Sequence, residues 1–143
     1  MECFSMGVVY TADVVSAGDG RNGRVRSSDG VLELGLASPK EVGGPGGATN
    51  PEQLFAAGYA ACFHSALRLS AREAKVALAE DTVSARVHLE RDESGYSISA
   101  DLVVALPGIP EDVARSLVEQ AHGRCPYSKA VRDSIRVGIS LAP

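Results

Sequence analysis

The sequence lacks the features that mark nucleic-acid-binding, membrane-spanning and secreted proteins. Its 143 residues carry 14 Lys and Arg against 18 Asp and Glu, a net charge of −4, so it offers no basic surface to nucleic acid. No apolar run approaches the roughly 20 residues that cross a bilayer. The first residues have neither a basic n-region nor a long apolar segment, so we expect no signal peptide. A cytoplasmic protein is the expectation that follows.

Cysteine is scarce too, which argues against a disulfide-stabilised fold. The chain has three cysteines, Cys3, Cys62 and Cys125. In the cytoplasm such cysteines are inert, bind a metal or take part in redox chemistry, and they do not normally form structural disulfides. Cys3 lies near an end of the chain that we expect to be frayed, and we assign it no role.

A glycine-rich segment, 38–49, lacks the residues of a phosphate-binding loop. It contains Pro39, Pro45 and four glycines, and it leads into a predicted helix, which is where such a loop would lie. No Gly-Lys-Ser or Gly-Lys-Thr follows it. We interpret the segment as a flexible connection to the helix.

The order of strand and helix signals is typical of an α+β protein. Alternating apolar and β-branched residues predict strands, Asp29-Gly30 predicts a hairpin turn, and proline and glycine mark the helix ends. We see no internal repeat or linker, so we expect one domain, 1–143, whose first three strands form an antiparallel sheet. The predicted elements are strands at 8–15, 24–28 and 31–36, a helix from 51 to about 75, strands at 81–91 and 96–106, a helix at 110–123, a short helix beginning at 125–126, and a strand at 135–141.

The helix that begins at Pro51 is expected to be central and buried. Asn50 can cap its first N–H groups, Pro51 suits the first helical position, and the helix dipole favours Glu52 in the first turn. No charged residue then occurs before Arg68, so this helix has little that requires water. Its small residues, Gly58 among them, would let a second helix of this chain or of another subunit approach closely.

Cys62, in the middle of this helix, has two interpretations. Most unpaired helix cysteines are small buried hydrophobic residues, and a thiol in apolar surroundings stays protonated unless a cation lies nearby. Cys125 precedes Pro126, which begins a helix, so its sulfur is expected close to free N–H groups. Cys125 is therefore either a helix-cap residue or a partner thiol of Cys62 in a redox pair.

A zinc site would be another use of these cysteines. Cys62 with His64, and His122 with Cys125, supply the four ligands of a tetrahedral site. However, residues two positions apart on a helix point roughly 200° apart, so Cys62 and His64 cannot readily bind one ion. We expect no metal, and we interpret His64, His88 and His122 as ordinary surface or packing histidines.

Arg21 and Glu52 are candidates for activating a thiol. Each also has an ordinary explanation, as a solvated loop charge and as a favourable first-turn charge. In the functional interpretation, Arg21 stabilises a thiolate at Cys62 while Glu52 holds the guanidinium by a bidentate pair. Glu52 and Cys62 are roughly 15 Å apart along a straight helix. Arg21 must therefore span that distance, the helix must bend near Gly58, or the groups must come from different subunits.

Several separated segments of the chain resemble one known family. The helix segment 50–63 closely resembles the peroxidatic helix of the organic hydroperoxide resistance proteins, the Ohr branch of the Ohr/OsmC family. The resemblance runs in order from Tyr10 to about Leu141. Its other segments are 20–24 with 27–30, 43–47 and 125–128.

This resemblance implies an α+β, OsmC-like fold with antiparallel sheets packed around a long central helix, and an intertwined homodimer with two active sites at the subunit interface. It also implies a thiol-dependent peroxidase that reduces alkyl and fatty-acid hydroperoxides to alcohols. No bound metal, haem or flavin is expected, and the expected reductant is a dithiol such as dihydrolipoamide on a lipoylated protein. The alternative is a non-enzymatic redox-sensing or small-molecule-binding protein on the same fold.

The resemblance also assigns roles to single residues. Cys62 resembles the peroxidatic cysteine, and Cys125 the resolving cysteine that forms a disulfide with it. Arg21 matches the arginine that stabilises the thiolate and orients the peroxide, and Glu52 the carboxylate that holds this arginine. His64 stands where we expect an apolar residue. The apolar stretch that would suit an alkyl substrate comprises Leu54, Phe55 and Phe63.

Overall fold

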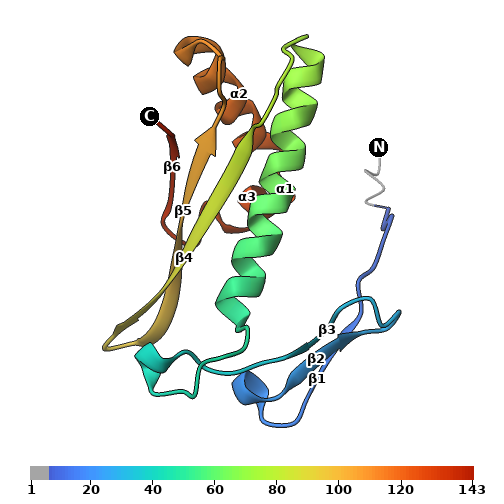
Figure 1. Ribbon diagram of the computed structural model, residues 1–143, viewed down its shortest axis with the longest axis vertical. Coiled ribbons are helices and arrows are strands. Elements are labelled where there is room, and N and C mark those ends of the chain that lie inside the picture. Colours follow the sequence, from blue (N-terminus) through green and yellow to red (C-terminus); the bar gives the residue numbers. More distant parts are fainter. Residues whose placement is uncertain (1–6) are drawn as a thin grey trace, which may run out of the picture. The chain divides into compact units, whose positions relative to one another are not determined.

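The computed structural model describes residues 7–143, and its chain forms two compact units. One unit is the chain up to Pro51 and the other is Glu52–Pro143 (Figure 1). Cys3 lies outside the described residues. The expectation of a single domain stays a prediction, because the compactness of each unit does not show that it folds independently of the other.

The first unit contains the predicted three-stranded antiparallel sheet. At one turn, the Asp29 carboxylate accepts hydrogen bonds from the Ser27 hydroxyl (2.6 Å) and from the Val31 N–H (3.0 Å). This bonding closes the turn that Asp29-Gly30 indicated, because an Asx side chain can replace a backbone acceptor there. The strands, in the order β1-β2-β3, are β1 (Val14–Ala17), β2 (Arg24–Ser27) and β3 (Glu33–Gly35).

The prediction of a first strand at 8–15 is wrong in its bounds, because β1 begins only at Val14. The β1–β2 ladder runs from Ala17↔Arg24 to Val14↔Ser27. Beyond Ser27 the chain turns back toward β3, so no residue of β2 is left to form ladder hydrogen bonds with residues 8–12. The composition of 8–15 favours a strand, but a strand also needs a neighbour to bond to.

The segment 38–49 was expected to be a flexible connection, and in the structure it is folded back on itself. It contains a 3₁₀ helix, Lys40–Val42. The N–H of Gly44 donates to the carbonyl of Pro39 (3.0 Å), and the N–H of Gly46 donates to the carbonyl of Ser38 (2.9 Å). These bonds give the segment a defined course toward the helix that follows.

The sheet of the first unit leaves much apolar surface exposed. Val14 is 48% exposed and Val15 is 68% exposed. Among the described residues of this unit, the buried hydrophobic side chains are Leu36 and Ala37. A three-stranded sheet with so few buried apolar side chains has no sufficient core of its own.

The second unit is built on one long helix and a second sheet. The helix, α1 (Pro51–Glu73), is drawn as one helix in Figure 1 and is continuous through position 58, so any bend at Gly58 does not interrupt it. Its predicted start is confirmed, and it ends two residues before the predicted Lys75. The other elements are β4 (Thr82–Asp92), β5 (Gly95–Ala105), α2 (Glu111–Arg124), α3 (Pro126–Val131) and β6 (Val137–Leu141).

The second sheet has the order β4-β5-β6 and contains one parallel pairing. β4 and β5, which correspond to the strands predicted at 81–91 and 96–106, form an antiparallel hairpin in register from Thr82↔Ala105 to Asp92↔Gly95. β6 lies parallel to β5, from Ala100↔Val137 to Val104↔Leu141. The connection from β5 to β6 passes through α2 and α3, as a parallel neighbour requires because it needs a long crossover.

The core of this unit lies between α1, β5 and α2. Its fully buried side chains include Tyr59, Phe63 and Leu67 of α1, Leu102 of β5 and Leu117 of α2. The expectation of a buried helix therefore holds for one face of α1, whereas Ala57, Ala61 and Ser65 on its other face are exposed. In the part of the chain that the structure describes, we find no helix with the length and apolar character to cross a membrane.

Two of the histidines interpreted as surface or packing residues are bonded to carboxylates. The buried Asp81 binds His64 Nε2 (2.7 Å) and Arg68 (2.9 Å), and Asp101 binds His88 Nε2 at 2.8 Å. Burial raises the pKa of Asp81, but the His64 hydrogen bond and the Arg68 charge outweigh it and hold this pKa below its usual value. The bonds from Asp81 to His64 and Arg68 link α1 to the residue immediately before β4.

Candidate active site

Cys62 and Cys125 are brought together by the packing of three helices. Cys62 lies on α1, and Cys125 links the end of α2 to the start of α3. Cys125 lies near enough to Cys62 to raise its pKa, and Cys62 packs against the buried core cluster that contains Cys125. Cys62 is partly exposed, Cys125 is completely buried, and neither is in a disulfide. The structure thus places the two predicted cysteines in one region, with Cys62 the more exposed of the two.

The surroundings of Cys62 favour the protonated thiol. Burial raises the pKa of Cys62, and the adjacent Cys125 raises it further. A hydrogen bond from the backbone N–H of Tyr127 acts in the opposite direction but does not cancel these effects. A thiolate at this position therefore needs a cation as well, since the thiolate is the nucleophilic form.

Cys125 is held by the backbone at a helix junction. Its N–H donates to the carbonyl of Ala121 (2.8 Å) at the end of α2, and its carbonyl accepts from the N–H of Lys129 (3.0 Å) in α3. The Ser128 N–H donates to Cys125 Sγ at 3.5 Å. The expected proximity of this sulfur to an N–H at the start of a helix is confirmed. The local signal was Cys125-Pro126, since proline suits the first helical turn.

An aromatic cluster adjoins the two sulfurs. The ring centroids of Phe55 and Tyr127 are 6.0 Å apart, and the ring planes meet at 62°. The ring centroid of Tyr59 lies 6.1 Å from that of Phe55 and 5.9 Å from that of Tyr127. Tyr59 is completely buried, whereas Tyr127 is 38% exposed. Phe55 and Tyr127 therefore provide the apolar surface that a ligand could reach beside Cys62.

Gly58 makes room for this arrangement. A Cβ at position 58 would lie 2.5 Å from the hydroxyl oxygen of Tyr127 and 3.0 Å from its Cζ. Such contacts are too short for real atoms, so any side chain at position 58 would displace the Tyr127 ring. The glycine thus lets Tyr127 lie directly on α1, one turn before Cys62.

The expected apolar stretch needs one correction. Phe55 is part of the aromatic cluster, but Phe63 is completely buried in the core and cannot meet a ligand. Tyr127 was not predicted to line the site. Its position within the motif 125–128 was the available signal, but its contact with α1 depends on packing between distant segments.

Arg21 and Glu52 belong to different units. Arg21 lies in the 3₁₀ helix Gly20–Asn22 between β1 and β2, and Glu52 lies in the first turn of α1. Gly18 and Gly20 have φ angles of 85° and 56°, in the left-handed region, so the turn that carries Arg21 requires glycine there. The association of Arg21 and Glu52 with the two cysteines stays a prediction.

Comparison with known proteins identifies the family. A family model described as OsmC-like protein matches residues 44–140. The organic hydroperoxide resistance protein OhrA of Bacillus subtilis is 48% identical over 141 residues, which cover 94% of this chain and 96% of that protein. The chain belongs to the OsmC-like family, in its organic hydroperoxide resistance branch.

Solved structures of the same branch agree with the fold. The structure of an organic hydroperoxide resistance protein from Legionella pneumophila is 44% identical, with a TM-score of 0.91 and coverage of 96% of this chain and 100% of that one. Another, from Elizabethkingia anophelis, is 42% identical, with a TM-score of 0.90 and coverage of 96% and 99%. The predicted OsmC-like α+β fold is confirmed. The family match contains Glu52, Cys62 and Cys125, whereas Arg21 precedes it.

Proposed function

We propose that this protein is a thiol-dependent peroxidase that reduces organic hydroperoxides, alkyl and fatty-acid, to alcohols. The observation that carries the proposal is the proximity of Cys62 and Cys125 beside an aromatic surface. Membership of the organic hydroperoxide resistance branch supports the substrate class. The reachable part of the site is apolar, which suits an alkyl substrate better than hydrogen peroxide.

The reaction has two steps on the protein. The Cys62 thiolate attacks the distal peroxide oxygen, the O–O bond breaks, and the alkoxide takes a proton and leaves as an alcohol. Cys62 is then a sulfenic acid. The Cys125 sulfur attacks the Cys62 sulfur, an S–S bond forms and the S–O bond breaks, and hydroxide leaves as water with the proton of the Cys125 thiol.

A dithiol completes the cycle. Cys125 is completely buried and Cys62 is partly exposed, so an external thiolate would attack the Cys62 sulfur and release Cys125. The second thiolate of the same molecule then attacks the sulfur of the first and displaces the Cys62 thiolate, which restores both cysteines and leaves the reductant as an intramolecular disulfide. We propose dihydrolipoamide on a lipoylated protein as this reductant, a cytoplasmic location and no bound cofactor.

Activation of Cys62 requires a cation, because burial and Cys125 raise its pKa. We assign this role to Arg21, with Glu52 holding the guanidinium by paired hydrogen bonds. In the transition state the same guanidinium would stabilise the developing charge on the leaving oxygen. The left-handed glycines at 18 and 20 give the Arg21 turn the backbone freedom to open and close.

We also propose that the protein acts as an intertwined homodimer with its two sites at the interface. The support in this chain is the exposed apolar surface of β1, where Val14 and Val15 are 48% and 68% exposed. A second subunit covering this sheet would supply the burial that the first unit lacks.

Steady-state turnover tests the proposed function. We expect cumene hydroperoxide to be consumed continuously with dihydrolipoamide, and at least about 10-fold more slowly with an equal concentration of a monothiol, because the second thiol of a dithiol acts intramolecularly. The measurement is loss of hydroperoxide against enzyme concentration. A sensor or binding protein on this fold would be oxidised once and would not cycle, and that outcome would reject the enzyme.

The charge of Arg21 sets a pH dependence that can be measured. In Arg21→Ala, the pKa of Cys62 should rise toward the value that burial imposes, so less thiolate exists at neutral pH. We expect the second-order rate of Cys62 oxidation near pH 7 to fall about 10- to 100-fold, and the rise of rate with pH to move to more alkaline pH. Stopped-flow oxidation across the pH range measures both effects, with Arg24→Ala as the matched control. An unchanged profile would remove Arg21 from the site.

A further inference from the structure

A buried chain of hydrogen bonds adjoins Cys125 and has no part in the chemistry proposed above. The Tyr59 hydroxyl bonds to Ser128 Oγ at 2.7 Å, and His122 Nδ1 bonds to the same oxygen at 2.9 Å. Tyr59 comes from α1, His122 from α2 and Ser128 from α3. Ser128 therefore joins the three helices near the two cysteines.

The same serine contacts Cys125 through its backbone. The Ser128 N–H donates to Cys125 Sγ at 3.5 Å, while its side chain is held on both sides by Tyr59 and His122. Both Ser128 and Cys125 are completely buried. Any shift of Ser128 would therefore move the N–H that contacts the sulfur.

The protonation states of the partners fit a continuous chain. Burial raises the pKa of Tyr59, so this hydroxyl is a donor. Burial and the charge of Arg132 lower the pKa of His122, so its ring is neutral at neutral pH. A neutral ring can accept a hydrogen bond at Nδ1. The Tyr59 hydroxyl then donates to Ser128 Oγ, and the Ser128 hydroxyl donates to His122 Nδ1, so these three polar groups are paired.

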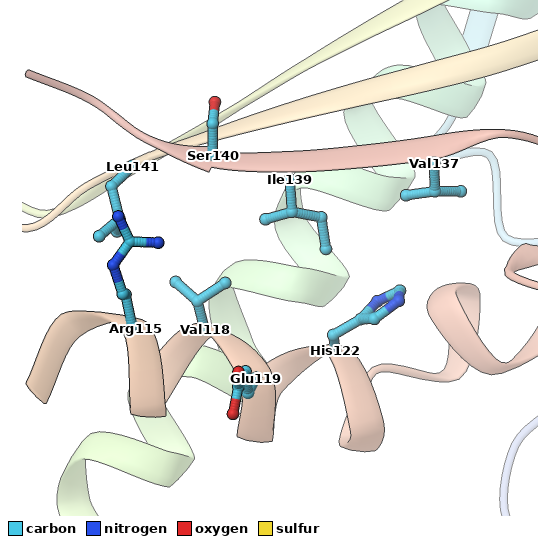
Figure 2. Close-up of a pocket in the computed structure, with 8 residues that line it drawn as sticks. All are labelled: Arg115, Val118, Glu119, His122, Val137, Ile139, Ser140 and Leu141. Atoms are coloured by element: carbon cyan, nitrogen blue, oxygen red, sulfur yellow. The ribbon is translucent and has the colours of Figure 1, made fainter. Parts of the chain in front are cut away.

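The imidazole of His122 lies where this chain meets the surface. Figure 2 shows His122 and Val118 projecting from α2 toward β6, with Val137 and Ile139 of β6 projecting toward α2. These residues line a pocket of about 330 Å³. His122 thus lines the pocket with part of its ring, while its Nδ1 is bonded to Ser128.

We propose that Ser128, held by Tyr59 and His122, is a positioning residue that keeps the Cys125 sulfur against Cys62. The proposal rests on the resolving role of Cys125 given above. Its consequence is kinetic: the disulfide forms faster than a second hydroperoxide can oxidise the Cys62 sulfenic acid. The three residues exchange no net proton, because the thiol proton of Cys125 leaves in the water that is formed.

Tyr59→Phe is the sharpest test, since it removes one hydroxyl and keeps the ring. In single-turnover experiments we expect oxidation of Cys62 to keep its rate and disulfide formation to slow about 5- to 10-fold, the effect of losing one buried hydrogen bond. Ser128→Ala, which removes both side-chain bonds, should slow disulfide formation further. Mass spectrometry should show more sulfinic acid per turnover in both variants. Tyr96→Phe, which removes an exposed hydroxyl on β5, is the matched control.

Two results would overturn the proposal: disulfide formation at the wild-type rate in both variants, or an equal slowing of both steps, which would indicate a general loss of structure.

Diamide, which oxidises paired thiols without a peroxide site, separates this proposal from the proposed function. If hydroperoxide does not oxidise the wild-type protein, but diamide joins Cys62 to Cys125 more slowly in the variants, the peroxidase fails and the positioning role stands. Equal diamide rates would reject the positioning role.

Discussion

Cys62→Ser is expected to abolish hydroperoxide reduction while leaving the fold intact. Serine has nearly the shape of cysteine, and Cys62 is only partly buried, so the packing of α1 should change little. A serine hydroxyl, however, is not ionised near neutral pH and cannot form a sulfenic acid. Loss of a covalent nucleophile lowers rates by factors on the order of 10⁴ or more, so activity should fall to the background of free hydroperoxide and dithiol.

The measurement is steady-state consumption of cumene hydroperoxide with dihydrolipoamide, together with circular dichroism and thermal unfolding to establish that the variant is folded. Cys3→Ser is the matched control, since Cys3 has no assigned role and should be dispensable. Sustained turnover by folded Cys62→Ser would show that another group performs the reaction. The proximity of Cys62 and Cys125 would then have only a structural meaning.

Cys125→Ser is expected to react once, at least as fast as the wild type because Cys125 no longer raises the pKa of Cys62, and then to inactivate. Cys62 remains as the nucleophile, so the first hydroperoxide should be reduced to an alcohol. The thiol near Cys62 is gone, and a neighbouring group held close by reacts far faster than a thiol arriving from solution. The sulfenic acid therefore survives long enough to meet a second hydroperoxide and to become sulfinic or sulfonic acid.

Intact-mass measurements distinguish the two proteins. After stoichiometric cumene hydroperoxide, the wild type should lose two hydrogens, whereas Cys125→Ser should gain one oxygen. With excess hydroperoxide the variant should gain further oxygens and stop turning over, and peptide mapping should place them on Cys62. A wild type that keeps its two hydrogens, or a variant that resists over-oxidation as well as the wild type does, would contradict the assignment of Cys125 as the resolving thiol.

Several features of this protein were determined by residues close together in the sequence. The start of α1 at Pro51 follows from its first turn, and the β2–β3 turn follows from the carboxylate of Asp29 and the glycine beside it. The junction at Cys125 follows from the proline after it. Helix starts and tight turns are stabilised by hydrogen bonds between residues a few positions apart, so a local sequence pattern is enough to predict them.

The family, too, could be recognised without coordinates, because segments 20–24, 27–30, 43–47, 50–63 and 125–128 resemble it in order along the chain. The α+β class followed from the order of strand and helix signals. That resemblance named both cysteines as candidates. The residues themselves left each cysteine with an inert alternative, since a thiol's environment is made by groups that the local sequence does not contain.

The tertiary structure decided which distant groups meet. It shortened the first strand, because β2 ends before it can pair with residues 8–12, and it set β6 parallel to β5. Phe63 is buried in the core, and the Tyr127 ring packs against Gly58. Cys125 lies near Cys62, and the Ser128 N–H contacts the Cys125 sulfur. Each of these contacts joins segments separated by many residues, and only the packing of α1 with α2, α3 and the sheet determines which side chains meet.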